Sequence, residues 1–236
     1  MIDLSFFERA LSQVGVSLPP DTLRRFDVYA QELVRYNQKV NLTAITLPEE
    51  IAVKHFTDSL TLLSTPGIPQ GAKICDVGTG AGFPGMCLAI ARPDLRVTLF
   101  DSVDKKLAFL RSLSRLTETP VEIVHVRAED AGKRSQYRER FDLVTARAVA
   151  SLETLSEYCV PLVRVGGLFA PLKAPLSPEE AQRGVGAAAN LGASLKRRER
   201  ITLPGGAERE ILIFEKKSHT PPKYPRNSAQ IAKKPL

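Results

Sequence analysis

Cysteine and histidine are scarce in this chain, and neither has a spacing typical of a metal site or a disulfide framework. The three cysteines, Cys75, Cys87 and Cys159, form no CxxC pair, and the three histidines are scattered. Cys75 and Cys87 lie in apolar runs, so we expect both to be small core residues. An odd, unpaired set of cysteines is typical of a reducing compartment, so we expect a cytoplasmic protein without a bound metal ion.

Long apolar runs are also missing, because the longest ones are interrupted well short of the ~20 residues that a membrane span needs. Residues 1–15 lack the basic region and the small-residue cleavage site of a signal peptide. Their amphipathic pattern predicts a short helix that ends near Gly15. We therefore expect no membrane partner and no secretion signal, and we expect the chain to act as a monomer.

Acidic residues are absent from the C-terminal end of a chain whose formal net charge is +7. Residues 216–236 hold six Lys or Arg and no Asp or Glu, and residues 196–200 read KRRER. Residues 1–50, by contrast, hold five basic and seven acidic side chains. This asymmetry indicates a polyanionic partner. A basic tail that is merely solvated is the alternative.

The first 65 residues predict a helical extension. A helix from Pro20 places apolar side chains on one stripe, and another begins near Pro48, a residue suited to a first helical turn. Residues 66–73 are rich in proline and glycine and indicate a boundary. We therefore expect an extension over 1–65, a second domain over 66–217 and a basic tail over 218–236. The apolar stripes are Leu23, Phe26, Ala30 and Leu33 in the first helix, and Ile51, Phe56, Leu60 and Leu63 in the second.

After residue 66, strand-like runs alternate with helical runs, which predicts an α/β fold with a mostly parallel, Rossmann-like sheet. The final two strand-like runs, 194–203 and 208–217, are so close together that they should pair antiparallel. The tail after them has no periodic apolar face, so we expect it to be extended or loosely packed. The expected parallel strands are 73–77, 96–101, 121–126, 141–148 and 167–174, and the expected helices are 84–92, 104–116, 129–138, 152–163 and 178–191.

The stretch ICDVGTGAGFPGMCLAI, residues 74–90, passes from a strand through a glycine cluster into a helix. It matches the dinucleotide pattern G-x-G-x-x-G through Gly80, Gly82 and Gly85. It also matches acid-x-G-x-G-x-G through Asp76, Gly78, Gly80 and Gly82, which is typical of S-adenosyl-L-methionine (AdoMet) binding. In both patterns, glycines let a ligand approach the backbone.

The residues around the loop favour AdoMet over a dinucleotide. Asp76 would repel a pyrophosphate but suits a ligand that carries an ammonium and a sulfonium group. Pro84 lacks an amide that a phosphate would use. Asp101 ends the next strand, where it can accept hydrogen bonds from ribose hydroxyls in either case. The chain also leaves little length for the second domain of a dehydrogenase, although a dinucleotide site and a purely structural turn remain alternatives.

Seven stretches together resemble one family, the bacterial 16S ribosomal RNA guanine-N7 methyltransferases, also called RsmG or glucose-inhibited division protein B. They span nearly the whole chain in the expected order, and the motifs NLTAI, GTGAGFPG and TARA are specific in combination. The stretches are YNQKVNLTAIT (36–46), KHFTDSL (54–60), DVGTGAGFPG (76–85), DSVDKKLAFL (101–110), VRAED (126–130), FDLVTARAVASL (141–152) and KYPR (223–226).

The resemblance implies a class I AdoMet-dependent methyltransferase with an N-terminal helical extension. It implies that Gly78 and Phe83 line the cofactor, with Phe83 as an apolar wall, and that Ala128 and Glu129 hold the adenine end. It places Arg147 at the edge of the cofactor and reaction pocket. The implied substrate is one guanine in the 530 loop of 16S rRNA, alone or in the small ribosomal subunit, methylated at N7.

The residue chemistry agrees with N7 methylation, because N7 of guanine has a free lone pair and needs no general base. Catalysis then consists of placing N7 in line with the methyl group in a site cleared of water. None of the cysteines stands where the thiolate nucleophile of a C5 methyltransferase is held. TARAVAS stands where enzymes that methylate exocyclic amines carry an Asn/Asp-Pro-Pro-aromatic turn. We therefore assign the catalytic positions to Arg147 and Lys173, which can contact guanine O6 or a phosphate.

Several of these residues have an alternative structural role. Arg147 and Lys173 are also suited to ion pairs at strand ends. His55 and Asp58 favour a local hydrogen bond that anchors the N-terminal helices, and His125 is expected in the core.

A second group of residues is expected at the RNA. Asn37 and Asn41 suit either a helix cap or an RNA contact, and Tyr224 either stacks on a base or packs on the domain. The expected RNA-binding residues are Lys196, Arg197, Arg198, Lys223, Tyr224 and Arg226.

Two other functions stay open at this point. One is a methyltransferase that acts on a small molecule or a protein, for which binding should depend little on salt. The other is an RNA-binding protein that keeps the fold without catalysis, for which AdoMet should give no heat of binding.

Overall fold

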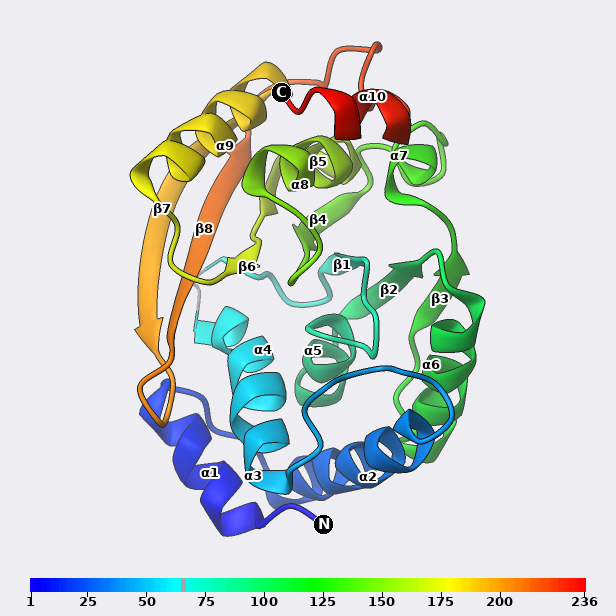
Figure 1. Cartoon of the computed structure of the whole chain (residues 1–236), viewed down its shortest axis with the longest axis vertical. Coiled ribbons are helices and arrows are strands. Elements are labelled where there is room, and N and C mark those ends of the chain that lie inside the picture. Colours follow the sequence, from blue (N-terminus) through cyan, green and yellow to red (C-terminus); the bar gives the residue numbers. More distant parts are fainter. Residues whose placement is uncertain (65–66) are drawn as a thin grey trace.

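The computed structural model describes residues 1–64 and 67–236, and within them eight strands form one sheet (Figure 1). Five strands are parallel in the order β3-β2-β1-β4-β5, and β8 continues the sheet antiparallel to β5 and β6. Strand β7 pairs antiparallel with β8. The predicted fold class, with its terminal hairpin, is confirmed. The strands are β1 (Lys73–Val77), β2 (Arg96–Asp101), β3 (Glu122–His125), β4 (Phe141–Thr145), β5 (Val163–Phe169), β6 (Leu172–Lys173), β7 (Ala193–Thr202) and β8 (Glu208–Lys216).

Most predicted helices are present, with some differences in length. Helix α7 ends at Ala131, so the expected helix over 129–138 is wrong beyond its first turn. The expected domain boundary at residues 65 and 66 lies outside the described residues. The helices are α1 (Leu4–Gln13), α2 (Pro20–Asn37), α3 (Pro48–Glu50), α4 (Asp58–Leu60), α5 (Gly85–Ala91), α6 (Asp104–Leu116), α7 (Ala128–Ala131), α8 (Leu152–Cys159), α9 (Pro178–Asn190) and α10 (Ser228–Lys233).

The helix that begins at Pro48 changes its winding along its length. After α3 it passes through a π-helical segment, Ile51–Thr57, and then through α4 into a 3₁₀ turn over Thr61–Ser64. Its apolar side faces the core, where Ile51, Phe56 and Leu60 are fully buried. A π-helical segment of this length is uncommon and is often found at functional sites.

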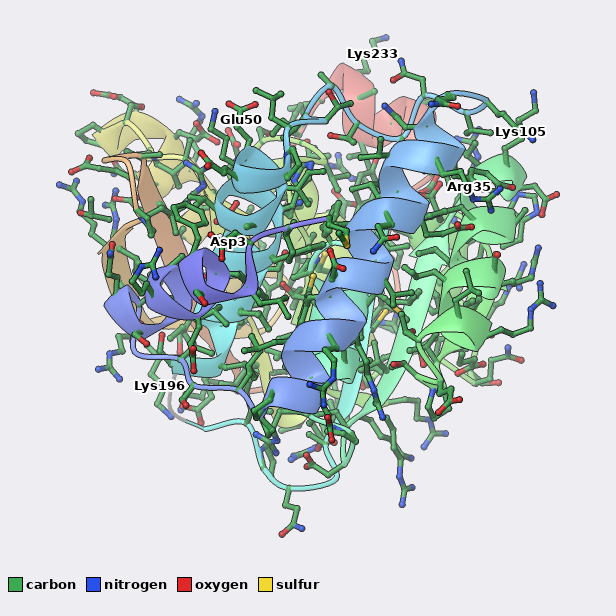
Figure 2. All side chains as sticks on the ribbon, turned by 90° about the horizontal axis from the view of Figure 1, so that it is seen from below. Asp3, Arg35, Glu50, Lys105, Lys196 and Lys233 are labelled. Atoms are coloured by element: carbon green, nitrogen blue, oxygen red, sulfur yellow. The ribbon has the colours of Figure 1, made fainter. Side chains whose placement is uncertain are left out.

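The two faces of the sheet bury two separate apolar clusters. Successive strand residues point to opposite faces, so Ile74 joins one cluster and its neighbour Cys75 joins the other. Helices α1 and α2 share the Ile74 cluster with α5 and α6. Seen from below, α1 and α2 lie in front of the strands (Figure 2). The N-terminal helices are therefore part of the main core. Cys75 and Cys87 are buried in these clusters as expected, and Cys159 is buried in the second one.

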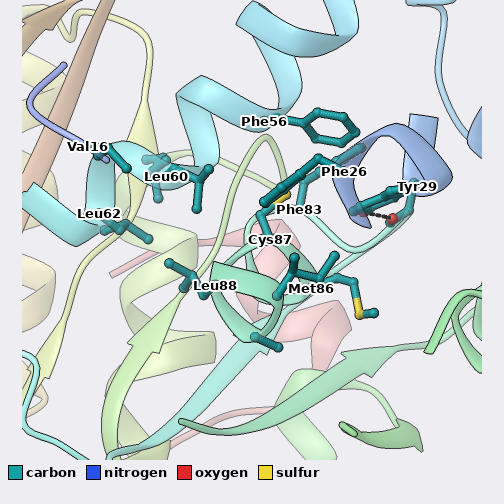
Figure 3. Packing of buried hydrophobic residues seen from close by; sticks show 14 of the residues in the cluster. Val16, Phe26, Tyr29, Phe56, Leu60, Leu62, Phe83, Met86, Cys87 and Leu88 are labelled. Atoms are coloured by element: carbon teal, nitrogen blue, oxygen red, sulfur yellow. Dashed lines mark hydrogen bonds between the residues drawn. The ribbon is translucent and has the colours of Figure 1, made fainter. Parts of the chain in front are cut away.

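Aromatic rings join the N-terminal helices to the start of α5. Phe26 and Phe56 lie 5.0 Å apart between ring centroids, and Tyr29 stacks on Phe83 at 5.4 Å (Figure 3). The Tyr29 hydroxyl donates to the carbonyl oxygen of Ala81 in the glycine-rich loop. The N-terminal extension thus supports that loop directly.

The prediction of an extended or loosely packed C-terminal tail is wrong. Helix α10 is closed by a reciprocal capping box between Asn227 and Gln230, and Ile231 is fully buried. Figure 1 shows α10 against α8 and α7, at the end of the molecule opposite the N-terminus. A six-residue helix offers a single apolar contact, which is too little for a periodic pattern in the sequence.

Charged side chains hold the segment that leads to α10. The Arg138 guanidinium donates to the carbonyl oxygens of Thr220 and Tyr224, both at 2.8 Å. Arg226 pairs with Glu157 of α8, whose side chain is fully buried, at 2.6 Å. In the part of the chain that the structure describes, no helix is long and apolar enough to cross a membrane.

Candidate functional site

The glycine-rich loop joins β1 to α5 at the carboxyl end of the parallel strands. Gly78 and Gly80 have φ angles of +69° and +59°, which L side chains rarely adopt. The amide of Gly78 donates to the carbonyl oxygen of Phe100 at 2.9 Å, so the loop folds against the end of β2. A Cβ atom at Gly85 would lie 2.7 Å from the Cβ atom of Asp76, so α5 starts directly against β1.

Asp76 lies under the loop and is fully buried. Its Oδ2 accepts hydrogen bonds from the Thr79 hydroxyl at 2.7 Å and from the Gly85 amide at 2.8 Å. Its Oδ1 has no partner. Burial raises the pKa of Asp76 to about 6, although both hydrogen bonds act against the shift. The free oxygen fits a ligand that brings a hydrogen-bond donor or a positive charge.

Asp101 at the end of β2 is tied to the loop from the other side. Its Oδ2 accepts from the amide of Gly80 at 2.9 Å and its Oδ1 accepts from the amide of Val103 at 2.9 Å. A carboxylate has about four acceptor directions. Asp101 is thus held in place and can still accept hydrogen bonds from ligand hydroxyls.

Four of the expected cofactor residues meet at one hollow of about 180 Å³: Gly78, Asp101, Ala128 and Glu129. Val149, from the segment between β4 and α8, closes it on one side, and a Cβ atom at Gly78 would lie 2.8 Å from Val149 Cγ2. The hollow thus combines carboxylates with apolar walls. Carboxylate acceptors and apolar walls are the chemistry that a ribose and an adenine ring require, whereas Asp76 is buried under the loop and does not border this hollow.

Arg147 follows β4 and points toward the N-terminal helices. Its Nη1 lies 3.1 Å from the carbonyl oxygen of Lys54 and 3.1 Å from Asp58 Oδ2. Its Nη2 lies 3.2 Å from Nδ1 of His55. The ion-pair role weighed for Arg147 is therefore present, while its expected contact with the cofactor stays a prediction.

The ring of Phe83, a residue of the glycine-rich loop, lies against this arginine. His55 stacks on its ring at 4.4 Å between centroids, and Arg147 Cζ lies 4.7 Å from the ring centroid. The ring is 6% exposed and does not border the 180 Å³ hollow. Its expected role as an apolar wall of the cofactor site stays a prediction.

A larger cavity of about 500 Å³ opens beside Arg147. Ala148 lines this cavity and Val149 lines the smaller hollow, so the segment after β4 separates the two spaces. The lining is mainly cationic and apolar, and the acidic residues in it are paired. The charged residues and the histidine that line it are Lys54, His55, Asp58, Arg147, Lys173, Glu180 and Arg209.

Lys173 on β6 is brought to the same cavity as Arg147, so the structure places the two expected catalytic residues together. Its Nζ donates to the carbonyl oxygen of Ala150 at 2.9 Å and lies 3.2 Å from Glu180 Oε1. Lys173 thus stabilises the segment after β4, which separates the 500 Å³ cavity from the 180 Å³ hollow.

The expected RNA-binding residues do not form one surface. Lys196 and Arg197 lie on exposed β7, whereas Arg198 pairs with the buried Glu210 of β8 at 2.9 Å. Lys223 and Tyr224 lie in the tail, where Tyr224 is half-buried against the second cluster. Arg226 forms an ion pair with the buried Glu157 at 2.6 Å, which argues against its expected RNA contact.

Two further sequence expectations concern local structure. His125 is exposed rather than in the core, because β3 is the edge strand and its ring Nε2 lies 3.0 Å from the Ser102 carbonyl oxygen. Asn37 organises the loop after α2: its Oδ1 accepts from the Leu42 amide at 2.7 Å and its Nδ2 donates to the Thr43 carbonyl oxygen at 2.9 Å. These bonds fix the loop and do not cap α2, so neither the helix cap nor the RNA contact is shown for Asn37.

Sequence reasoning missed the cluster around Arg147. The structure joins Thr43, His55 and Asp58 from the extension to Arg147 and to Arg209 of β8, whose Nε lies 3.1 Å from Asp58 Oδ1. His55 and Asp58 do anchor the N-terminal helices, but through Arg147 and Arg209. The signal in the sequence was the motif KHFTDSL, whose partners are distant along the chain.

Comparison with known proteins places this geometry in a class. A proposed methyltransferase from Bacillus halodurans matches with a TM-score of 0.54 at 15% identity, covering 69% of this chain and 100% of that one. TYW2 of M. jannaschii, in complex with AdoMet, matches with a TM-score of 0.51 at 15% identity, covering 61% and 69%. The chain has the fold of the class I AdoMet-dependent methyltransferases.

The family follows from closer relatives. Residues 22–201 match the GidB family, described as rRNA small subunit methyltransferase G. A relative of that name from Lactobacillus delbrueckii subsp. bulgaricus is 48% identical over 98% of both chains, and one from Desulfitobacterium hafniense is 47% identical over 95% of this chain and 93% of its own. The chain belongs to the GidB family, and it is a methyltransferase that uses AdoMet.

Proposed function

We propose that this enzyme methylates N7 of one guanine in the 530 loop of 16S rRNA. The relatives' names supply the small-subunit rRNA, and the resemblance in the motifs supplies the base and the loop. The observation that carries the proposal is the 500 Å³ cavity, which lies across one chain segment from the hollow that fits the cofactor and presents Arg147 and Lys173.

The cavity suits a nucleophile that needs no deprotonation. Its acidic side chains are paired, Asp58 with Arg147 and Arg209, and Glu180 with Lys173. His55 is hydrogen-bonded through both ring nitrogens, at 2.8 Å and 3.2 Å. These groups are poor candidates for a general base. Guanine N7 requires none, because its lone pair is free for attack.

The chain's residues then act by position and charge. Bound AdoMet supplies an electrophilic methyl group on a sulfonium. Asp76 and Asp101 would hold the cofactor's ammonium and ribose ends, and Ala128 and Glu129 its adenine end. Arg147 and Lys173 are suited to guanine O6 or to a flanking phosphate, which would orient N7 toward the methyl group.

The proposal is tested by incubating the enzyme with methyl-labelled AdoMet and either small-subunit RNA or 30S particles from cells that lack the enzyme. Borohydride reduction followed by aniline cleavage cuts RNA at 7-methylguanosine, so primer extension maps the product. We expect one cut in the 530 loop. Label at another atom or on protein would overturn the assignment.

A further inference from the structure

One short segment of the N-terminal extension supplies the hydrogen-bond acceptors around the Arg147 guanidinium. Nη1 lies within 3.1 Å of the Lys54 carbonyl oxygen and of Asp58 Oδ2, and 3.4 Å from the His55 carbonyl oxygen. Nη2 lies 3.2 Å from His55 Nδ1. Lys54 and His55 belong to the π-helical segment, whose wider turn presents their carbonyl oxygens to the arginine.

The protonation of His55 is fixed by this contact. A guanidinium group only donates hydrogen bonds, so His55 Nδ1 must accept. The ring proton is therefore on Nε2, which lies 2.8 Å from Thr43 Oγ1 and donates to it. Burial, together with the nearby Arg147 charge, lowers the pKa of His55 to about 3, so the ring stays neutral at physiological pH.

Thr43 is in turn held by the loop that Asn37 organises. Its hydroxyl accepts from the amide of Ile45 at 3.0 Å, and its own amide donates to Asn37 Oδ1 at 3.0 Å. A chain of defined donors and acceptors thus runs from the loop after α2, through Thr43 and His55, to the guanidinium at the edge of the cavity.

We infer that His55 and Thr43 are positioning residues, which fix the Arg147 guanidinium in the orientation that the reaction uses. The inference rests on the proposed role of Arg147 in orienting the substrate. His55 acts as a neutral acceptor through Nδ1, and Thr43 accepts the hydrogen bond from Nε2–H that fixes the orientation of the ring. The N-terminal extension is therefore part of the catalytic site as well as part of the core.

Substitutions at His55 separate this role from simple packing. His55→Asn keeps an oxygen near the place of Nδ1 and can accept from Arg147, but it loses the aromatic stack. His55→Phe keeps a ring on Phe83 and has no acceptor. We expect kcat to fall by about 10–100-fold in H55F and less in H55N, with the AdoMet affinity unchanged in both, because misplacement of an orienting group acts on the chemical step. A packing role would give the opposite order.

Thr43 supplies a second, matched pair. Thr43→Val removes the acceptor for His55 Nε2–H at nearly constant shape, and Thr43→Ser retains the hydroxyl. We expect T43V to lower kcat and T43S to stay within about twofold of the unaltered enzyme. Thermal unfolding curves of both variants identify any loss of folding, and equal kcat values for folded T43V and T43S would overturn the inference.

A spectroscopic measurement tests the tautomer without activity. Long-range ¹H–¹⁵N spectra distinguish histidine protonated on Nδ1 from histidine protonated on Nε2, and H55N assigns the signal among the three histidines. We expect Nε2–H at pH 7 in the unaltered protein, because the Arg147 guanidinium can only donate to Nδ1. An Nδ1–H ring in the unaltered protein would overturn the inference.

Arg147→Ala distinguishes the proposed role of Arg147 from the positioning role of His55 and Thr43. Full methylation by R147A would contradict the proposed role of Arg147 itself. If R147A is impaired while H55F and T43V have normal kcat, the role of Arg147 stands and the positioning inference fails.

Discussion

Asp76 shows how much a single carboxylate contributes to this loop. One oxygen is used inside the protein, by Thr79 and Gly85, and the other has no partner although the residue is fully buried. A buried carboxylate oxygen without a partner costs free energy. A cationic donor would offset that cost, so we propose that the free oxygen binds the ammonium group of AdoMet.

Asp76→Asn tests this assignment. The Asn side-chain oxygen can keep both hydrogen bonds of the loop, while its amide replaces the free oxygen and opposes an ammonium group. A hydrogen bond to a charged group contributes about 1.5–3 kcal/mol, so we expect AdoMet affinity to fall by about 10–100-fold. Isothermal titration calorimetry measures the affinity.

The stability of D76N serves as its control. Burial raises the pKa of Asp76 to about 6, so the charged form is penalised in the folded protein above that pH. The variant should therefore be as stable as the unaltered protein or more stable at pH 7.5. Unchanged AdoMet affinity in a stable D76N would show that Asp76 only shapes the loop.

His55 gives a pH dependence of stability. The pKa is about 3 in the folded protein against 6.5 for a free histidine. In the unfolded chain, His55 binds a proton below pH 6.5, whereas in the folded chain it binds one only below about pH 3. The free energy of unfolding therefore decreases as the pH falls from 6.5 to 3. At about 1.4 kcal/mol for each tenfold step in proton affinity, the upper limit is about 5 kcal/mol.

Urea unfolding at pH 7 and pH 5 measures this loss. The free energy of unfolding changes mainly below pH 6.5. Between pH 7 and pH 5 it should therefore decrease by about 2 kcal/mol more in the unaltered protein than in H55N, which cannot titrate at this position. The other two histidines contribute equally to both proteins. Equal losses would mean that residue 55 is accessible to protons in the folded state.

At the residue scale, the sequence predicts what is local and misses what is distant. Gly78, Gly80 and Asp76 are recognisable because the turn requires them within five positions. The contact of Arg147 with His55 joins residues 92 positions apart. No periodicity or spacing encodes such a pair, so the sequence indicates only the anchoring role of His55.

At the scale of elements, helix α9 packs on α8 through a glycine. A Cβ atom at Gly184 would lie 2.2 Å from Leu152 Cγ, so the Leu152 side chain of α8 packs directly on the backbone of α9. Gly186, two positions further along the same helix, has nothing within 4 Å of its would-be Cβ atom. Both glycines lie in α9, but only Gly184 packs against a neighbouring helix.

Alanine at these two positions should therefore have opposite effects. Gly184→Ala forces Leu152 and α8 to move and should destabilise the protein by about 1–3 kcal/mol. Gly186→Ala should stabilise it by about 0.5–1 kcal/mol, because alanine favours a helix over the unfolded chain. Chemical denaturation measures both, and equal signs would contradict the packing of α8 on α9.

At this scale, the sequence predicts a helix or strand correctly where the residues of that element have a recognisable pattern of their own. The parallel strands have continuous apolar runs, and a four-residue gap predicts the β7–β8 hairpin. The π-helical segment and α10 have no such signal, because π winding leaves the apolar pattern nearly unchanged and α10 depends on one buried residue, Ile231. Both were decided by tertiary contacts.

At the scale of the whole molecule, the basic residues are distributed over separate surfaces. Lys196 on β7 and Lys105 on α6 lie on opposite sides of the molecule (Figure 2). Strand β8 beside β7 contributes Arg209 to the 500 Å³ cavity, whereas α6 contributes no residue to it. We propose that a large RNA that enters the cavity contacts the β7 side and not the α6 side.

Salt dependence of RNA binding tests this path with two matched variants. Lys196→Glu with Arg197→Glu, and Lys105→Glu with Lys106→Glu, each exchange two basic for two acidic residues, so both lower the formal net charge from +7 to +3. Lys196 and Arg197 are 60% and 54% exposed, and their ion pairs are at the surface, so the first variant should fold normally.

Each lost phosphate contact reduces the slope of log K against log salt by about 1. If RNA contacts β7, the slope of log K against log salt should decrease by about 2 in K196E/R197E and by little in K105E/K106E. The long-range attraction of RNA weakens equally in both variants, because their net charges are equal. Filter binding between 50 and 300 mM salt, roughly the range over which such slopes are measured, gives both values. Equal slopes for the two variants would mean that net charge, and not the β7 surface, attracts the RNA.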